Sequence, residues 1–423
     1  MKTFLVGGAV RDRLLNIPVK ERDWVVLEQT PEAMIRQGFL PVGKDFPVFL
    51  HPQSHEEYAL ARTERKTAPG YKGFTVHAAP DVTLEQDLKR RDLTINAMAM
   101  TPDGVIIDPF GGRQDLENRL FRHVSPAFCE DPVRILRVAR FAARYAHLGF
   151  RIAGETLALM QDMVASGEID YLVPERVWAE IQKALSEPAP VAFFQTLKDC
   201  RALAKILPEL DALFGVPQPE RYHPEIDTGV HSFLSLEQAG RLSAKPEVRL
   251  AALLHDLGKA LSPKANWPHH DGHEQSGIAL LNALCTRLRV PGSFAVLAKQ
   301  VMRYHTLCHR AFELRAKTLT DLLFALGAFK PDNNLNDLLL AAEADCKGRT
   351  GLEHSAYPQA AYIRDAALAA TCIDTSAVLT STLKGPQIGA AIRQLRIEAV
   401  AGFIKKRRSG THTDNATDSL DST

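Results

Sequence analysis

The sequence predicts a small α/β domain followed by a mostly α-helical body. Short runs of β-branched and aromatic residues alternate with helical segments early in the chain, at 4–6, 24–27, 47–50, 58–60 and 105–107. From about Asp131 onward the strand pattern nearly vanishes, and apolar residues recur at helical spacing over 131–150, 174–184, 248–254 and 318–329. We therefore expect strands and helices in the first domain, and mainly helices beyond it.

The composition excludes several classes of protein. The 423 residues include 51 Lys and Arg against 50 Asp and Glu, and 45% are hydrophobic. This balance disfavours both an acidic disordered chain and a uniformly basic nucleic-acid coat protein, so a local patch would have to bind any anionic partner. No apolar run approaches the roughly 20 residues of a membrane span, and the first residues lack the pattern of a signal peptide. The six cysteines include no C-x-x-C pair, which indicates neither a disulfide framework nor a thiolate zinc site and favours the cytoplasm.

Three segments are predicted to lie outside regular structure. Residues 62–80 are basic and rich in turn formers, which is typical of a mobile loop beside a polyanion site or of an exposed loop without a role. Residues 214–228 contain several prolines and are expected to connect helical regions. The Ser-, Thr- and Asp-rich residues 409–423 are expected to form a disordered tail.

The first candidate site begins at a glycine turn. Gly7 and Gly8 follow the first predicted strand and open a helix, so backbone N–H groups can approach a phosphate there. A tight turn without a ligand is the alternative, because neither a P-loop nor a G-x-G-x-x-G fingerprint is present. About ten residues later, Glu21 and Asp23 are expected to project from the same side of a strand, although a solvated strand edge is the simpler interpretation. Two such carboxylates can hold the pair of divalent cations used in nucleotidyl transfer.

Arginines extend this site. The run Lys89-Arg90-Arg91 precedes Asp92, and a predicted helix opens with Glu130 and Asp131, where a cap and the helix dipole favour acids. Four arginines then share one arc of that helix, at positions 134, 137, 140 and 144. They form either a solvated face or, together with a fixed carboxylate, a set of donors and acceptors for a nucleobase edge.

The second candidate site is rich in histidine. Eight of the 15 histidines lie between positions 223 and 309, more than core packing would require. His255 and Asp256 end a predicted apolar helix and can offer an imidazole and a carboxylate to one cation. Further candidate ligands are His231, Asp345, His273 and His305.

In chain order, these motifs resemble those of the bacterial CCA-adding tRNA nucleotidyltransferases. The matching motifs are Gly7-Gly8-x-x-Arg11-Asp12, the acidic pair 21/23, Arg90-Arg91-Asp92-x-x-x-Asn96-Ala97, Asp108-Pro109-x-Gly111-Gly112 and Glu130-Asp131-x-x-Arg134-x-x-Arg137-x-x-Arg140-Phe141. The resemblance continues through Val177-Trp178 and the segment 223–231 to His255-Asp256, and is to the long multifunctional form with a histidine-aspartate (HD) phosphohydrolase domain.

The resemblance implies a domain order. It implies an α/β nucleotidyltransferase head with a small mixed sheet over 1–130, and a helical neck for base selection and tRNA binding over 131–215. An HD-type helical domain is expected over 216–330, and a C-terminal helical region over 331–408.

The resemblance also implies roles for single residues. Gly8 and Arg11 would bind the triphosphate, Glu21 and Asp23 would hold Mg²⁺, Arg91, Arg137 and Arg140 would contact the nucleotide, and Glu130, Asp131 and Arg134 would select the base. Glu57 matches a third acidic strand position. In the HD domain, His231, His255, Asp256 and Asp345 would hold Ni²⁺ or another divalent transition metal.

The implied activity is addition or repair of the 3′-terminal CCA of tRNA from CTP and ATP, without a nucleic-acid template. The second implied activity is a phosphatase or 2′,3′-cyclic phosphodiesterase that acts on damaged RNA ends. The expected partners are tRNA, CTP and ATP, with no membrane, and the chain is expected to be a monomer or a homodimer.

One position departs from the family pattern. The pattern is Asp-x-Asp, whereas this chain has Glu21, one methylene longer. Because Mg²⁺ demands near-ideal octahedral geometry, a ligand displaced by roughly an ångström can cost about a hundredfold in rate. We expect Glu21 to keep binding metal while weakening transfer. Three rivals remain at this point: a poly(A) polymerase, an HD phosphohydrolase whose head is impaired by Glu21, and an RNA-binding chaperone with both sites silent.

Overall fold

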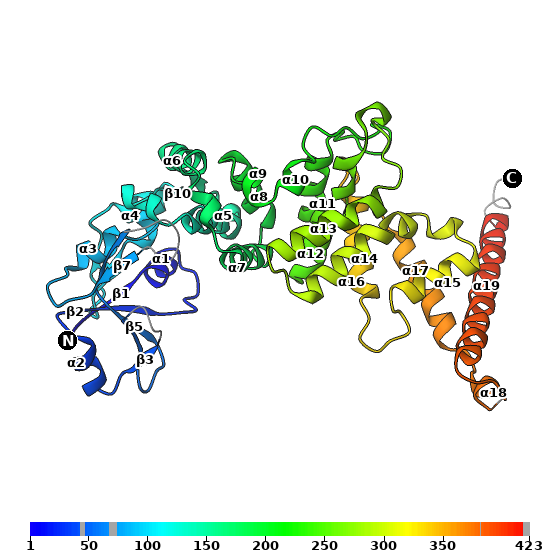
Figure 1. The fold of residues 1–423 in the computed structure, drawn as a ribbon, viewed down its shortest axis with the longest axis horizontal. Coiled ribbons are helices and arrows are strands. Elements are labelled where there is room, and N and C mark those ends of the chain that lie inside the picture. The colour runs from blue at the N-terminus through cyan, green and yellow to red at the C-terminus, as the bar shows by residue number, and fades with distance from the viewer. Residues whose placement is uncertain (43–46, 67–73, 381, 418–423) are drawn as a thin grey trace. The chain divides into compact units, whose positions relative to one another are not determined.

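The computed structural model describes residues 1–42, 47–66, 74–380 and 382–417, and the chain divides into two compact units, Met1–Pro208 and Glu209–Thr423 (Figure 1). The first unit holds the α/β head and a set of helices, and the second unit is helical throughout its described part. This agrees with the predicted fold class. The predicted head (1–130) and nearly all of the predicted neck (131–215) lie in the first unit, and the boundary between them stays a prediction.

A seven-stranded mixed sheet forms the centre of the head. Its strands run in the order β3-β4-β5-β2-β1-β8-β9, with β2 and β5 parallel and the other neighbouring pairs antiparallel. Their bounds are β1 Lys2–Val6, β2 Asp23–Leu27, β3 Leu40–Val42, β4 Val48–Leu50, β5 Glu57–Leu60, β8 Ala99–Met100 and β9 Ile106–Ile107. All five predicted strands are therefore confirmed, and β3 and β8 were not predicted.

Apolar side chains cover both faces of this sheet. On β1, Val6 packs into one cluster with Leu88, and Leu5 packs into another with Val10 and Met98, because successive strand residues point to opposite faces. The surrounding helices are α1 Gly8–Leu14, α2 Pro31–Arg36, α3 Leu84–Lys89 and α4 Gly112–Glu117.

Part of the predicted loop over 62–80 is regular. Strands β6 (Thr63–Lys66) and β7 (Phe74–His77) pair as an antiparallel hairpin, so the prediction of a loop is wrong for these residues. β-branched and aromatic residues in 74–77 favour strand despite the turn formers between the strands. Residues 67–73 lie outside the described residues, and the predicted mobility is untested there.

Helices complete the first unit. They are α5 Val133–Tyr145, α6 Gly154–Ala165, α7 Pro174–Leu185, α8 Pro190–Asp199, α9 Leu203–Ile206 and α10 Pro208–Asp211, the last of which spans the boundary between the units. Helix α5 packs against α7 and α8. The short parallel strands β10 (Leu120–Phe121) and β11 (Arg151–Ile152) join the head to this helical region.

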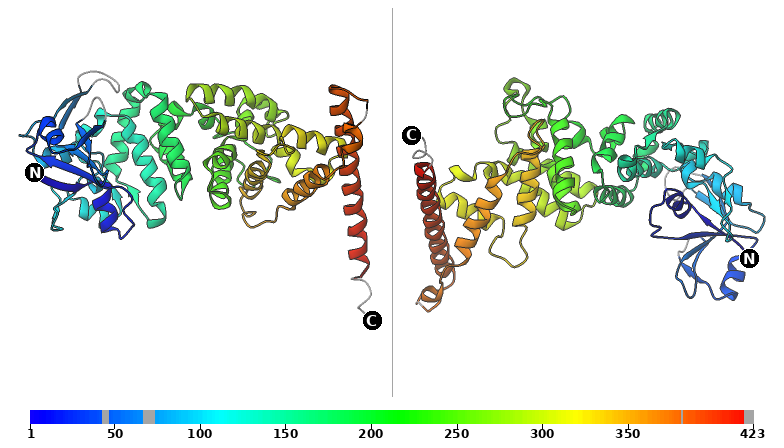
Figure 2. Two further views of the ribbon diagram at one scale, coloured as in Figure 1. Left: turned by 90° about the horizontal axis from the view of Figure 1, so that it is seen from below. Right: turned by 180° about the vertical axis from the view of Figure 1, so that it is seen from behind.

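The second unit is a set of packed helices (Figure 2). Their bounds are α11 Thr228–Leu242, α12 Pro246–Leu254, α13 His273–Arg287, α14 Gly292–His309, α15 Ala316–Ala325, α16 Leu335–Lys347, α17 Pro358–Thr371, α18 Ser376–Leu379 and α19 Pro386–Thr417. Helix α16 packs against α11, α12 and α14, so a domain boundary at residue 330 would separate it from the helices that it contacts.

The end of the chain also differs from prediction. Helix α19 continues to Thr417, whereas residues from 409 onward were expected to be disordered. A helix already nucleated upstream gains one hydrogen bond for each residue that it adds, and this favours continuation into a polar segment. Residues 418–423 lie outside the described residues. None of the described helices has the length and apolar character needed to cross a membrane.

Candidate active sites

The glycine turn leaves room for an arginine. Gly7 has φ +68°, and a Cβ atom there would lie 2.8 Å from Nη1 of Arg91, so a side chain at this position would push the guanidinium away. A Cβ atom at Gly8 would lie 3.3 Å from Nη2 of Arg11. Arg11 is only 3% exposed and stacks on Tyr145, with 5.1 Å between the guanidinium carbon and the ring centroid. The turn thus fixes two cations beside the first turn of α1.

The two predicted carboxylates, Glu21 and Asp23, lie close enough to repel each other. Strand β2 begins at Asp23, so Glu21 lies just before the strand rather than on it, and the prediction that both project from one strand is wrong for Glu21. Both residues nevertheless line the same cleft. Partial enclosure raises the pKa of Asp23, Arg91 lowers it, and Glu21 raises it further. A divalent cation would relieve this repulsion, which fits the proposed Mg²⁺.

Glu57 lies beside Asp23 but does not line the main cleft. It is the register partner of Asp23 across the parallel pair β2 and β5. It lines a neighbouring cavity of about 520 Å³ that also reaches Glu21 and Asp23, rather than the main cleft. Within the described residues, the three carboxylates do not form a ligand group whose atoms lie within 4.8 Å of one another. Its role as a third ligand therefore stays a prediction.

A buried polar network links the head to α5. The carboxamide oxygen of Asn96 accepts from Nη1 of Arg11 at 2.6 Å, and its nitrogen donates to Asp92 at 3.0 Å. Nε of Arg137 donates to the other oxygen of Asp92 at 2.8 Å. Burial alone would raise the pKa of Asp92, but Arg137, Asn96 and Arg134 hold it well below its usual range. The arginines of the cleft are thus oriented before any ligand binds.

Two of the predicted base-selecting residues are also held by contacts. Asp131 accepts a hydrogen bond from the backbone N–H of Val133 at the start of α5 and pairs with Arg176 of α7 at 2.9 Å. Arg134 donates to the carbonyl oxygens of Ala127 and Arg90 at 2.9 and 2.6 Å. Glu130 ends a short 3-10 helix, Pro126–Glu130, and is not among the residues that line the cleft.

The remaining predicted cation is part of a buried ion pair. Arg140 donates to Glu180 of α7 at 2.6 Å, and both side chains are less than a tenth exposed. The predicted nucleotide-binding role and this pairing are compatible, because a guanidinium has five donors.

The cleft that these residues share has a volume of about 730 Å³. The predicted residues that line it are Gly8, Arg11, Glu21, Asp23, Arg91, Asp131, Arg134, Arg137 and Arg140. Its cationic lining was only partly predicted, since Arg176 and Lys183 are contributed by α7. Their spacing of seven residues on one helix was the only local signal. The lining thus combines the carboxylates of Glu21 and Asp23 with many arginines, which suits a metal-bound triphosphate.

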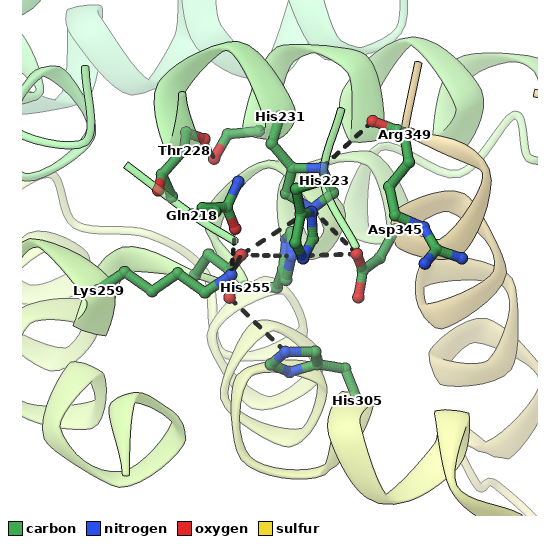
Figure 3. A network of polar contacts seen from close by, with 12 residues as sticks. Gln218, His223, Thr228, His231, His255, Lys259, His305, Asp345 and Arg349 are labelled. Carbon is green, nitrogen blue, oxygen red and sulfur yellow. Dashed lines mark hydrogen bonds and ion pairs between the residues drawn. The ribbon is translucent and has the colours of Figure 1, made fainter. Parts of the chain in front are cut away.

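The predicted histidine site in the second unit is compact (Figure 3). His231 lies on α11, His255 and Asp256 directly follow α12, and Asp345 lies on α16. Nε2 of His231 is 3.0 Å from Oδ1 of Asp345, and Nε2 of His255 is 3.1 Å from Oδ2 of Asp256. His273 is also close, with Nε2 at 3.2 Å from Oδ1 of Asp256. The ligands predicted from widely separated positions thus meet at one point.

Backbone carbonyls fix the orientation of these histidines. Nδ1 of His255, His273 and His305 contacts the carbonyl oxygens of Ala252, His270 and Val301 at 2.8, 2.8 and 3.1 Å, respectively. Nδ1 of His231 contacts two acceptors, Oε1 of Glu225 at 3.0 Å and the carbonyl oxygen of Gly348 at 3.2 Å. Because a carbonyl oxygen can only accept, each Nδ1 carries the hydrogen and each neutral ring keeps its lone pair on Nε2. This is the arrangement of metal-binding histidines.

The site also has unsatisfied polar atoms. Among the described residues, Nε2 of His255, Nε2 of His273 and both oxygens of Asp256 are buried without a hydrogen bond of good geometry, although ion-pair distances join them. Burial alone would lower the pKa of His255, but Asp256 and Asp345 raise it to about 10. Burial lowers the pKa of His305 to about 3. The residues present therefore fit a divalent cation, which would replace the proton that the two carboxylates attract.

A cavity of about 390 Å³ is lined by Asp256, Asp345, His273 and His305, but not by His231 or His255. Lys259 lies 2.6 Å from Asp256, and His309 lies 2.7 Å from Asp345. Arg349, Cys346 and Gln359 complete part of the lining. Sequence reasoning missed Lys259 and Arg349, although each follows a predicted ligand by three or four residues. The cations would favour an anionic substrate.

Comparisons with known proteins agree with this geometry. Residues 3–122 match the family model described as the poly A polymerase head domain, residues 149–214 match a probable RNA- and SrmB-binding site of polymerase A, and residues 228–345 match the HD domain. A protein of Methylococcus capsulatus named Multifunctional CCA protein is 66% identical over 412 residues, which cover 97% of either chain. A protein of the same name from Teredinibacter turnerae is 59% identical over 400 residues, 95% of this chain and 97% of that one.

Solved structures share the fold. The Thermotoga maritima CCA-adding enzyme complexed with tRNA has a TM-score of 0.62 at 20% identity, covering 95% of this chain and 87% of that one. The Bacillus stearothermophilus enzyme in complex with CTP has a TM-score of 0.61 at 21% identity, covering 97% and 94%. Given the high identity to the curated relatives over nearly the whole chain, the protein belongs to the family of bacterial multifunctional CCA proteins, in which a nucleotidyltransferase head is joined to an HD phosphohydrolase domain.

Proposed function

We propose that the head adds and repairs the 3′-terminal CCA of tRNA, using CTP and ATP and no nucleic-acid template. The observation that carries this proposal is the cleft of the first unit, which is lined by Glu21 and Asp23 together with many arginines. The names of the curated relatives support it. A cytoplasmic location and either a monomeric or a dimeric state stay predictions.

In the proposed reaction, the terminal hydroxyl of tRNA attacks the α-phosphate of CTP or ATP, and pyrophosphate leaves. Mg²⁺ held by Glu21 and Asp23 would activate the hydroxyl and neutralise charge on the leaving group. Gly8 and Arg11 would bind the triphosphate and Arg91 would contact the nucleotide, because both guanidinium groups lie beside the glycine turn. Binding to the tRNA backbone weakens as salt rises, because lysines and arginines displace counterions from phosphates.

Base selection is assigned to the start of α5. Asp131 offers an acceptor and Arg134 offers donors, and each is held in place by partners described above. Arg137 and Arg140 would contact the nucleotide from the next turns of the same helix. Glu130 is the weakest of these assignments, because it does not line the cleft.

Product length tests the proposal. The protein is incubated with tRNA that lacks its terminal CCA, together with Mg²⁺, labelled CTP and ATP, and the products are separated at single-nucleotide resolution. Addition of three nucleotides and no more supports CCA synthesis. Long additions with ATP alone would instead favour the poly(A) polymerase, whose head domain gives its name to the matching family model.

The same assay measures the effect of Glu21. We expect the Glu21→Asp variant to transfer nucleotides faster than the parent, because the shorter side chain restores the family ligand geometry. Equal transfer rates in the parent and the variant would refute the prediction that Glu21 weakens transfer. Transfer that is detectable only in the variant would show that Glu21 does not bind metal productively, and the HD activity would then be the function to pursue.

For the second unit, the proposed activity is phosphohydrolysis, as a phosphatase or 2′,3′-cyclic phosphodiesterase acting on RNA ends. Ni²⁺ or another divalent transition metal held by His231, His255, Asp256 and Asp345 would supply an activated water. The positive charge of Lys259 would stabilise negative charge on the scissile phosphate. The His255→Ala variant should lose hydrolysis of 2′,3′-cyclic AMP while keeping CTP and ATP transfer. Unchanged hydrolysis would rule out this site.

A further inference from the structure

A second, more apolar groove lies in the helical unit. It has a volume of about 360 Å³ and is lined by η7 (Ala311–Glu313), α17 and α19. Two aromatic residues line it, Phe312 and the largely buried Tyr362, whose rings are 4.8 Å apart. Behind them, the ring of Phe403 lies 5.1 Å from that of Tyr362 without lining the groove. Phe312 is 48% exposed, so its ring is open to a ligand that enters the groove.

Cations border this groove. Arg407 and Arg408 line it from α19, and Arg407 pairs with Asp365 of α17 and stacks on Phe403. Between residues 386 and 409 this helix carries six Lys and Arg and one Glu, although the whole chain has a net charge of only +1. Positive charge is therefore concentrated on the helix that forms one wall.

The groove is a neighbour of the HD cavity. His309 ends α14 and lines the HD cavity, and Phe312 follows it by three residues. Gln359 lines the HD cavity, and the adjacent Pro358 lines the groove. Hydrogen bonds from Tyr357 to Nδ1 of His309 and from Gln359 to its carbonyl oxygen, at 3.0 and 3.3 Å, hold the two segments together. The end of α14 and the start of α17 thus contribute to both cavities.

A half-exposed ring, that of Phe312, beside Arg407 and Arg408 matches the way proteins bind single-stranded nucleic acid. Bases stack on aromatic rings irrespective of sequence, and arginines pair with the phosphates between them. We infer that this groove binds a nucleotide upstream of the RNA end that enters the HD cavity, so that the HD site acts on RNA strands in preference to free nucleotides. This inference rests on the proposed phosphohydrolase activity.

The test compares two substrates on the whole protein. One is 2′,3′-cyclic AMP, and the other is a short single-stranded oligoribonucleotide that ends in a 2′,3′-cyclic phosphate. For Phe312→Ala we expect the ratio of the KM for the oligonucleotide to the KM for the mononucleotide to rise at least about fivefold, since stacking contributes about 1–3 kcal/mol per base. The matched control is Phe324→Ala, which removes a 39% exposed ring on α15 outside the groove and should leave the ratio as in the parent.

A second variant tests the cations. The salt dependence is measured as the slope of log KM for the oligonucleotide against log salt concentration. Replacing both Arg407 and Arg408 by Gln should lower this slope by about 1.4, since each phosphate contact on a single strand contributes about 0.7. The control is Arg364→Gln, which removes an exposed cation of α17 that hydrogen-bonds Asn336. An unchanged ratio for Phe312→Ala together with an unchanged salt slope would overturn the inference. If the parent hydrolyses neither the mononucleotide nor the oligonucleotide, the proposed phosphohydrolase activity is overturned instead.

Discussion

Removing the charge of Asp92 should destabilise the first unit measurably. Oδ1 of Asp92 accepts from the backbone N–H of Leu93 at 2.9 Å and from Asn96 at 3.0 Å, while Oδ2 accepts from Arg137 at 2.8 Å. In the Asp92→Asn variant one of these oxygens becomes an NH₂ group. Whichever way the amide turns, a donor faces a donor, so at least one buried hydrogen bond is lost.

The size of the effect follows from these contacts. A hydrogen bond to a charged group contributes about 1.5–3 kcal/mol to the free energy of unfolding. Because Arg137 is partly exposed, solvent screens the interaction, and we expect a loss of about 2 kcal/mol. The first unit has 208 residues, and for units of this size each kcal/mol corresponds to roughly 2–4 °C in Tm. We therefore expect the Tm of this unit to fall by about 4–8 °C, measured by calorimetry on the whole protein.

Two controls isolate the contribution of the Asp92–Arg137 pair. Asp81→Asn removes an exposed carboxylate of the same unit and should change stability by less than about 0.5 kcal/mol. In a double-mutant cycle with Arg137→Met, the two losses should be non-additive by about 1 kcal/mol or more. Additive losses, or an Asp92→Asn variant with the Tm of the parent, would refute the reasoning.

The pH dependence has a defined sign. Because the pKa of Asp92 is lowered in the folded state, its contribution is fully present above the unfolded pKa of about 3.9 and is lost as the pH falls toward the folded value. The difference in stability between parent and variant should thus be constant from pH 5 to 8 and should shrink below about pH 4.

Three further outcomes are expected. Arg176→Gln should change the ratio of kcat/KM for CTP to that for ATP by about tenfold, because Asp131 loses a charge-assisted partner, and an unchanged ratio would show that this pairing does not position Asp131. Gly258→Ala should destabilise the second unit by about 1–3 kcal/mol, because its Cβ would lie 2.0 Å from a backbone carbonyl oxygen, while Gly292→Ala, with open space around it, serves as the control in the same thermal assay. Ni²⁺ at about 100 times its Kd should stabilise the second unit by about 2.7 kcal/mol in the parent and much less in Asp256→Asn, and equal stabilisation would place the ion elsewhere.

The sequence predicted features that depend on neighbouring residues. The β-branched run 24–27 became β2, and the arginine periodicity became one face of α5, because strand and helix patterns are local. The clustering of the candidate HD ligands was also predictable, since His255 and Asp256 are adjacent and the other histidines are enriched within one stretch of the chain. Convergence of His231 and Asp345, 114 residues apart, required the resemblance to a family in addition to the pattern.

Contacts between distant single residues were not predictable. Arg176 lies 45 residues after Asp131, and no local pattern distinguishes it from a solvated helix cation. The same holds for the groove around Phe312, which exists only where α17 and α19 pack together. For Arg140 the sequence pattern predicted contact with the nucleotide but did not predict its ion pair. In the structure Arg140 forms a buried ion pair with Glu180. A buried pair of this kind fixes the guanidinium in one orientation, so a residue can be held by the fold and still present its remaining donors to a nucleotide.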